Sequence, residues 1–196
     1  MSKGIDTRSK IIMQSARLFN RVGYHACALS DIMKATGLKK GGIYNHFSNK
    51  DEIAEAAFDY NFNLIKKTLQ ERLFRETDPR EKIEAILDTY AHLERLPEFE
   101  AGCPIFNTAV DASNTHPKLK EKAKQAINHL KTYIIKKIEE GMEQGIFQST
   151  ADKEAVATMM LMTMEGALVM SRVSDDRCIA VAVEGIKSYL NVNLYQ

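Results

Sequence analysis

The sequence has few of the residues that interrupt or cross-link a chain, with 4 Pro, 10 Gly and 3 Cys in 196 residues. The cysteines, at positions 27, 103 and 178, are too scattered for a disulfide framework or a zinc site, so we expect no bound metal and a reducing cytoplasm. No stretch approaches the ~18 apolar residues of a membrane span, and the first residues lack the apolar core of a secretory signal. We therefore expect a globular protein without membrane association.

The charges are nearly balanced in number but unevenly distributed. Lys and Arg total 27 against 26 Asp and Glu, a formal net charge of +1. Residues 1–50 hold nine basic and two acidic side chains, a charge of +7, which leaves −6 for the remainder. A basic first quarter, which begins with Lys3, Arg8 and Lys10, is expected where one end of a protein meets a polyanion.

Apolar residues recur at helical spacing almost throughout, which predicts an all-α fold of about nine helices. The expected ranges are about 7–21, 29–36, 40–46, 50–73, 79–96, 105–113, 117–144, 152–172 and 176–190. Candidate N-terminal caps are Asp6 or Thr7 for the first helix and Ser48 or Asn49 for the fourth. Asp78 and the following proline open the fifth.

Two of these helices, 29–36 and 40–46, are separated by a turn at Gly37 inside the basic segment, which is the pattern of a helix-turn-helix. The run reads Ala35-x-Gly37-Leu38-x-Lys40-Gly41-x-Ile43-Tyr44-x-His46-Phe47-x-x-Lys50-x-x-Ile53, preceded by Leu18-Phe19-x-x-x-Gly23-Tyr24. Over residues 7–55 the chain closely resembles the DNA-binding domain of TetR family transcriptional regulators. The resemblance implies a three-helix DNA-binding domain in residues 1–48 and a helical effector-binding and dimerisation domain in residues 49–196.

Three positions depart from the usual pattern of that family. Lys39 stands where a Ser or Thr usually caps the recognition helix, Gly42 replaces a usual Thr, and Ala28 replaces a usual capping Thr. We therefore expect the recognition helix to begin without a side-chain cap. We also expect the start of the preceding helix to shift towards Ser30.

The recognition helix of a helix-turn-helix enters the major groove with its N-terminal residues leading. Base reading is therefore predicted chiefly for Lys40 and Asn45, and more weakly for Lys39. The resemblance implies DNA contacts at several of these positions, and the full set of predicted DNA-binding residues is Lys39, Lys40, Gly41, Gly42, Tyr44, Asn45, His46, Lys50 and Arg8. The alternatives are packing roles for Tyr44 and His46 and plain solvation of the lysines, whereas Ile32, Ile43 and Phe47 are expected in the core.

After about residue 50, the resemblance implies a pocket for a small-molecule effector. Two recognition helices, one from each subunit, must lie about 34 Å apart to bind a roughly palindromic double-stranded operator. Binding of the effector is expected to change this spacing. Aromatic and Met residues there suit a largely apolar effector. The predicted lining residues are Phe58, Phe62, Tyr90, Phe99, Cys103, Phe106, Tyr133, Met160 and Met164. Plain core packing is the alternative for each of them.

The last two predicted helices are apolar over more of their circumference than a monomer needs, which predicts a homodimer. The residues expected in that interface are Met159, Met170, Ile179, Val183, Ile186 and Leu190.

Cys103 lies at a predicted helix start, where the pKa of a thiol is lowered. It is therefore either a reactive sensor or a buried inert cysteine. The rival functions are a thiol enzyme that combines Cys103 with His92 or His116, and a helical interaction module without DNA affinity. The sequence has no Ser-His-Asp order, phosphate-binding glycine loop or metal-ligand spacing. We expect a cytoplasmic transcriptional regulator without a cofactor or enzymatic activity. It is expected to be a repressor that its effector releases from the operator, with activation of transcription as the alternative.

Overall fold

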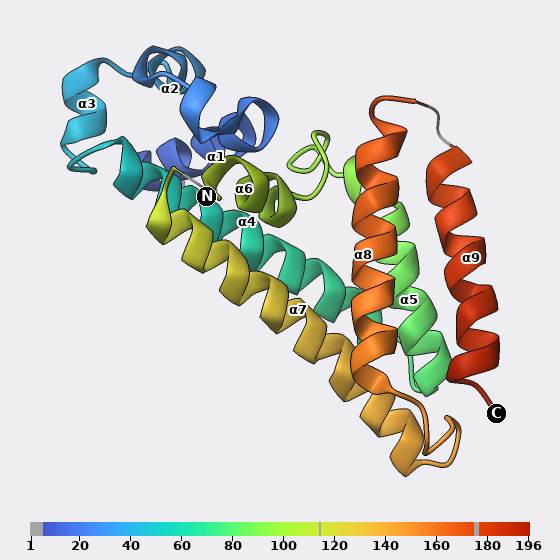
Figure 1. Ribbon diagram of the computed structural model, residues 1–196. Helices are drawn as coiled ribbons and strands as arrows, with labels where there is room; N and C mark the ends of the chain where they lie inside the picture. The colour runs from blue at the N-terminus through green and yellow to red at the C-terminus, as the bar shows by residue number, and fades with distance from the viewer. Residues whose placement is uncertain (1–5, 114, 175–176) are drawn as a thin grey trace. The chain divides into compact units, whose positions relative to one another are not determined.

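The computed structural model describes residues 6–113, 115–174 and 177–196, and nine α-helices account for most of them (Figure 1). The predicted all-α class is confirmed. The helices and one 3-10 turn are α1 (Thr7–Ala26), α2 (Leu29–Thr36), α3 (Lys40–Tyr44), α4 (Lys50–Leu73), α5 (Pro79–Ala91), η1 (Leu93–Arg95), α6 (Pro104–Ala112), α7 (Pro117–Glu143), α8 (Lys153–Ser171) and α9 (Arg177–Asn193). No helix in the described ranges is long and apolar enough to cross a membrane.

The described residues form two compact units. The first unit contains residues 6–65 and 94–125, and the second contains residues 66–93 and 126–196. The unit that carries α1, α2 and α3 thus also includes α6 and the first turns of α4 and α7. The domain boundary expected between residues 48 and 49 stays a prediction.

Several helices have an N-terminal side-chain cap at the position that the sequence predicts. The Asp6 carboxylate accepts the backbone N–H of Ser9 at 3.0 Å, and Asp78 accepts two backbone N–H groups at the start of α5. Asn49 is the cap of α4, because its Oδ1 accepts the N–H of Glu52 at 2.9 Å. These acceptors satisfy N–H groups that have no partner within their helix.

The start of α2 differs from the prediction. The helix begins at Leu29, with Ala28 at the cap position, instead of shifting to Ser30. The carboxylate of Asp31 accepts the backbone N–H of Ala28 at 2.8 Å, and this bond ties the cap residue to the first turn without a capping hydroxyl.

Two helix ends also differ. α1 continues beyond the expected end at Arg21 to Ala26, but its regular geometry breaks at Gly23, where φ is 80°. α5 stops at Ala91, about five residues early, and the chain continues as the short turn η1.

Each unit has its own apolar core. In the first unit, buried side chains from α1, α2, α3 and α4 meet, and they include the expected core residues Ile32, Ile43 and Phe47. In the second unit, α8 and α9 pack along each other and α5 packs against both. Ile86, Met164 and Ile186 are among the fully buried residues of this second core.

The end of α7 shows a close approach of a ring to the backbone. Gly145 ends the helix with φ 68°, and the N–H groups of Ile146 and Phe147 donate to the carbonyl of Gly141 at 2.9 and 3.1 Å. The fully buried ring of Phe147 then lies against Gly141, where a Cβ would stand 2.2 Å from Cδ2 of that ring. Only glycine fits at position 141 without displacing the ring.

Candidate nucleic-acid interface

The turn between α2 and α3 is built by local hydrogen bonds and one left-handed residue. Gly37 follows α2 with φ 70° and ψ 13°, a conformation that favours glycine. The Thr36 hydroxyl donates to the carbonyl of Ile32 at 2.7 Å and accepts the N–H of Leu38 at 3.3 Å. These contacts shape the turn that joins α2 to α3, the second helix of a helix-turn-helix.

α3 buries one apolar side chain and exposes its polar ones. It begins at Lys40 with Lys39 at the cap position and no side-chain cap, as expected from the missing hydroxyl. Ile43 is fully buried and anchors the helix to the core. The predicted DNA-binding residues of this segment are exposed or half-buried, namely Lys39, Lys40, Gly41, Gly42, Tyr44, Asn45 and His46.

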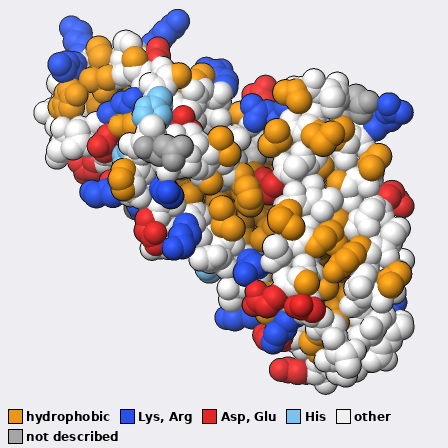
Figure 2. All heavy atoms as spheres, viewed as in Figure 1, with side chains coloured by type: hydrophobic (Ala, Val, Ile, Leu, Met, Phe, Trp, Pro, Cys, Tyr) orange, Lys and Arg blue, Asp and Glu red, His pale blue; other side chains and the backbone are white. Residues whose placement is uncertain are grey.

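Basic side chains lie beside this helix. Figure 2 shows Lys and Arg side chains gathered over the part of the first unit that holds α2 and α3. The Lys40 ammonium lies 5.7 Å from the ring centroid of Tyr44, and the Arg8 guanidinium lies 4.9 Å from that of Phe47. The structure therefore brings Arg8, from the start of α1, close to Phe47, three residues beyond the end of α3. Lys3 lies outside the described residues.

Lys50 has partners inside the protein. Its ammonium donates to the backbone carbonyls of Tyr24 at 2.6 Å and Cys27 at 2.7 Å, and it lies 4.1 Å from the ring centroid of Tyr24. Two of the three ammonium N–H groups are therefore used to join the start of α4 to the end of α1. The sequence gives no sign of this role, because the partners are 23 and 26 residues away.

The predicted effector-pocket residues are divided between the two units. The first unit holds Phe58, Phe62, Phe99, Cys103 and Phe106, and the second holds Tyr90, Tyr133, Met160 and Met164. Six of the nine are buried to 5% exposure or less. Phe58 lines a small cavity of about 20 Å³ in the first unit. Packing in the two cores therefore accounts for most of these side chains in the described structure, and their role as lining stays a prediction.

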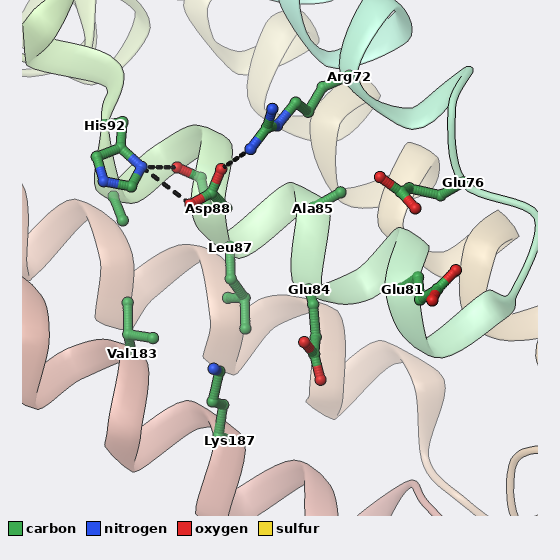
Figure 3. Close-up of a pocket in the computed structure, with 11 residues that line it drawn as sticks. Arg72, Glu76, Glu81, Glu84, Ala85, Leu87, Asp88, His92, Val183 and Lys187 are labelled. Carbon is green, nitrogen blue, oxygen red and sulfur yellow. Dashed lines mark hydrogen bonds and ion pairs between the residues drawn. The ribbon is translucent and has the colours of Figure 1, made fainter.

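A larger cleft of about 430 Å³ lies in the second unit, between the end of α4, α5 and α9 (Figure 3). Its walls combine apolar side chains with charged ones, and the lining residues are Arg72, Glu76, Glu81, Glu84, Ala85, Leu87, Asp88, Ala91, His92, Val183 and Lys187. An ion pair joins Arg72 to Asp88, and His92 Nδ1 lies 3.0 Å from the same carboxylate. The volume is within the range of small-molecule sites, about 300–1,000 Å³.

This cleft was not predicted from the sequence, and none of the predicted pocket residues lines it. A signal was present in α5, where Glu81, Glu84 and Asp88 are spaced three and four residues apart and therefore share one helix face. The lining contains four carboxylates but only two permanently basic side chains. The lining therefore carries more negative than positive charge.

Two of the residues predicted for the dimer interface are core residues instead. Ile186 and Leu190 are 0% exposed, because their side of α9 packs into the core of the second unit. Met159, Ile179 and Val183 are half-buried and Met170 is exposed.

Other apolar side chains on α8 and α9, and Val173 just after the end of α8, are more than half exposed. Together with Met170 they are Met162, Val169, Val173, Val181 and Val192. Figure 2 shows apolar side chains gathered along α8. Gly166 and Gly185, which are also exposed, lie on the same helix faces at helical spacing. We define this set of six apolar side chains and two glycines as the α8–α9 apolar face.

Cys103 is 3% exposed and stands at the cap position of α6. This burial favours the inert alternative, because reactive thiols are partly accessible. Among the residues that the structure describes, no three His, Cys, Asp or Glu side chains are grouped so that they could hold a metal ion.

A helix-turn-helix with an anchored, basic and exposed second helix defines a DNA-binding protein. Residues 11–57 match the model for bacterial regulatory proteins of the tetR family, and residues 79–186 match the tetracyclin repressor-like C-terminal domain. The chain belongs to the TetR family of transcriptional regulators.

Similar proteins support this assignment over nearly the whole chain. The HTH-type transcriptional regulator LmrA of Bacillus subtilis is 30% identical over 172 residues, which cover 87% of this chain and 88% of LmrA. A TetR transcriptional regulator from Chloroflexus aurantiacus has a crystal structure with a TM-score of 0.92 and 34% identity, and the match covers 100% of this chain and 99% of that one. A second structure, from Cytophaga hutchinsonii, has a TM-score of 0.86 and 30% identity over 98% and 97% of the two chains.

The predicted family and the predicted class of function are therefore confirmed. The protein is a DNA-binding transcriptional regulator, and members of this family are not enzymes. The thiol enzyme built on Cys103 is excluded by the family assignment.

Proposed function

We propose that the protein is a cytoplasmic, homodimeric repressor that binds a roughly palindromic operator and leaves it when a small-molecule effector binds. The observation that carries this proposal is α3, which is anchored by the buried Ile43 and presents basic and polar residues to solvent. Two copies of α3 must lie about one helical turn of DNA, ~34 Å, apart to occupy both half-sites.

The roles of the residues around α3 follow from their chemistry. Lys40 and Asn45 read base edges, because ammonium and amide groups match the acceptors and donors of the major groove. Tyr44, His46 and Arg8 contact phosphate oxygens and position the helix. A Cβ at Gly41 would meet nothing within 4 Å in the protein, so internal packing does not require glycine there. Close approach of the DNA backbone supplies a reason for it.

The α8–α9 apolar face is the proposed dimer contact. Exposed valine and methionine side chains on adjacent helices are costly in water and are expected to be covered by a second copy. Helices with exposed glycines allow such a partner to approach closely. Met170 belongs to this face, whereas Ile186 and Leu190 support it from the core.

The charged cleft of the second unit is the proposed effector site. A protein of the same fold from Saccharomonospora viridis, 20% identical, has been crystallised in complex with choline, so this fold accommodates a small organic molecule. In this chain the surplus of carboxylates at Glu76, Glu81 and Glu84 favours a cationic effector over the largely apolar one expected from the sequence.

A gel-shift experiment tests the proposal. The folded protein is titrated onto DNA that flanks its own gene at physiological salt, with a scrambled duplex of equal length as competitor. We expect a complex that resists the competitor and that is lost in Lys40→Ala. Absence of any specific complex with folded protein would reject the function. Stimulation of transcription from that DNA would favour an activator over a repressor.

A further inference from the structure

α6 and the segments around it are bonded to the second half of α1 by polar contacts between residues far apart in the sequence. The Arg17 guanidinium donates to the Glu98 carboxylate at 2.6 Å. The side-chain amide of Asn20 donates to the carbonyl of Gly102 at 3.0 Å, and that of Asn107 donates to Oδ1 of Asn20 at 2.8 Å. All of these residues lie within the first unit. We call this set of contacts the α1–α6 seam.

One contact of the seam lies on the irregular point of α1. Gly23 has φ 80° and interrupts the helix, and the N–H of the next residue, Tyr24, donates to the Asp111 carboxylate at 2.7 Å. A Cβ added to Gly23 would stand 3.1 Å from Oδ1 of Asp111, so the carboxylate lies directly over the kink. Asp111 therefore supplies the partner that an N–H at a helix break needs.

Tyr24, the residue after the kink, is also bonded to the start of α4. The carbonyl of Tyr24 accepts the Lys50 ammonium, and the phenol of Tyr24 donates to Asp51. Cys27, whose carbonyl also accepts Lys50, is fully buried and stands two residues before α2. A change in the backbone direction at Gly23 would therefore be passed to α2, which begins at Leu29, and from α2 to α3 through their shared core.

The packing between α6 and the kink is incomplete. A cavity of about 20 Å³, large enough for one water molecule, is lined by apolar side chains that include Phe58 and by polar ones that include Asn61 and Asp111. Asn61 is 4% exposed, and its Oδ1 has no hydrogen-bond partner in the protein. A hydrogen bond is lost when its donor and acceptor move only slightly apart, and the unfilled space leaves room for such a movement. Close-packed apolar side chains resist the same displacement.

We propose that Asp111 is a positioning residue for DNA binding: by accepting the Tyr24 N–H it fixes the kink at Gly23 and, through it, the orientation of α2 and α3. The inference rests on the proposed function, because it supplies the contact through which a movement of α6 would weaken operator binding. Asp111 itself touches no DNA in this role.

The test compares Asp111→Leu, which keeps the size of the side chain without an acceptor, with Asp111→Asn, which retains an acceptor oxygen. The matched control is Asp59→Leu, which removes an exposed carboxylate paired with Lys122 in the same unit. Operator affinity and its dependence on salt are measured by fluorescence anisotropy, with circular dichroism to monitor helix content.

We expect Asp111→Leu to bind the operator about 10- to 100-fold more weakly, the loss typical of one hydrogen bond to a charged group. The slope of log affinity against log salt should be unchanged, since no phosphate contact is removed. Asp111→Asn should remain within about three-fold of the wild type, and Asp59→Leu close to it. Equal affinity of Asp111→Leu and wild type, an equal loss in Asp59→Leu, or a smaller salt slope would overturn the inference.

Amide hydrogen exchange in the absence of DNA separates this inference from the proposed function. Asp111→Leu should accelerate exchange at the Tyr24 amide and in α2, and unchanged exchange there would reject the positioning role whatever the DNA result. If the wild type binds no DNA, the proposed function fails, and the exchange data alone decide whether Asp111 holds the kink.

Discussion

Lys50 offers a sharp test, because the sequence predicts a phosphate contact and the structure shows the ammonium bonded within the protein. Lys50→Met keeps the aliphatic stem and removes the bonds to the carbonyls of Tyr24 and Cys27. Each bond to a charged group contributes about 1.5–3 kcal/mol, and part of this returns when water solvates the freed carbonyls. We expect a net loss of about 2 kcal/mol, which lowers the Tm of a domain of this size by about 4–8 °C.

Thermal unfolding and a salt titration of DNA binding together decide the role of Lys50. Lys39→Met is the control, since Lys39 is exposed and stands at the start of α3. Lys50→Met should lower the Tm and the operator affinity while leaving the salt slope unchanged. Lys39→Met should leave the Tm unchanged and reduce the slope by about 0.9 if Lys39 neutralises one phosphate. An unchanged Tm in Lys50→Met with a slope reduced by about 0.9 would show that Lys50 is a phosphate contact and refute the internal role.

Three further predictions concern stability and assembly. Gly141→Ala should overpack the core against Phe147 and cost about 1–3 kcal/mol, seen as a lower Tm; an unchanged Tm would contradict the close ring contact. The hydrogen bond from Arg17 holds the pKa of Glu98 below its usual value of 4.5. The Arg17–Glu98 pair therefore stabilises the fold at pH values above 4.5, and this contribution is lost as the pH falls through the lower pKa of the folded state. Glu98→Gln should therefore lose less stability than the wild type between pH 5 and 3, measured by chemical unfolding, and parallel pH profiles would exclude this contribution. Val181→Glu should convert a dimer into monomers in light scattering, and a dimer of undiminished stability would exclude the α8–α9 apolar face.

Local signals in the sequence predicted most of the secondary structure. The acceptors Asp6, Asn49 and Asp78 mark helix starts by satisfying N–H groups a few residues away, so they can be recognised without the fold. Gly37 marks the turn of the helix-turn-helix for a similarly local reason. The start of α2 was predicted wrongly because the compensating bond comes from Asp31 and not from a hydroxyl at the cap.

Features that depend on distant parts of the chain could not be predicted in this way. Ile186 and Leu190 share α9 with exposed valines, and periodicity alone does not say which apolar side of such a helix faces the core of its own subunit. The ammonium of Lys50 finds its carbonyl partners only when α1 and α4 pack together. The charged cleft likewise requires α5 and α9 to lie side by side.

A nuclease footprint on the DNA that flanks the gene of this protein tests the central claim most directly, with the wild type and Lys40→Ala run in parallel at physiological salt. We predict a protected, roughly palindromic site whose half-sites are centred about one helical turn, or a multiple of it, apart. In Lys40→Ala this protection should be lost. Protection of a single half-site, or the same footprint in Lys40→Ala, would contradict a dimer that reads DNA through α3.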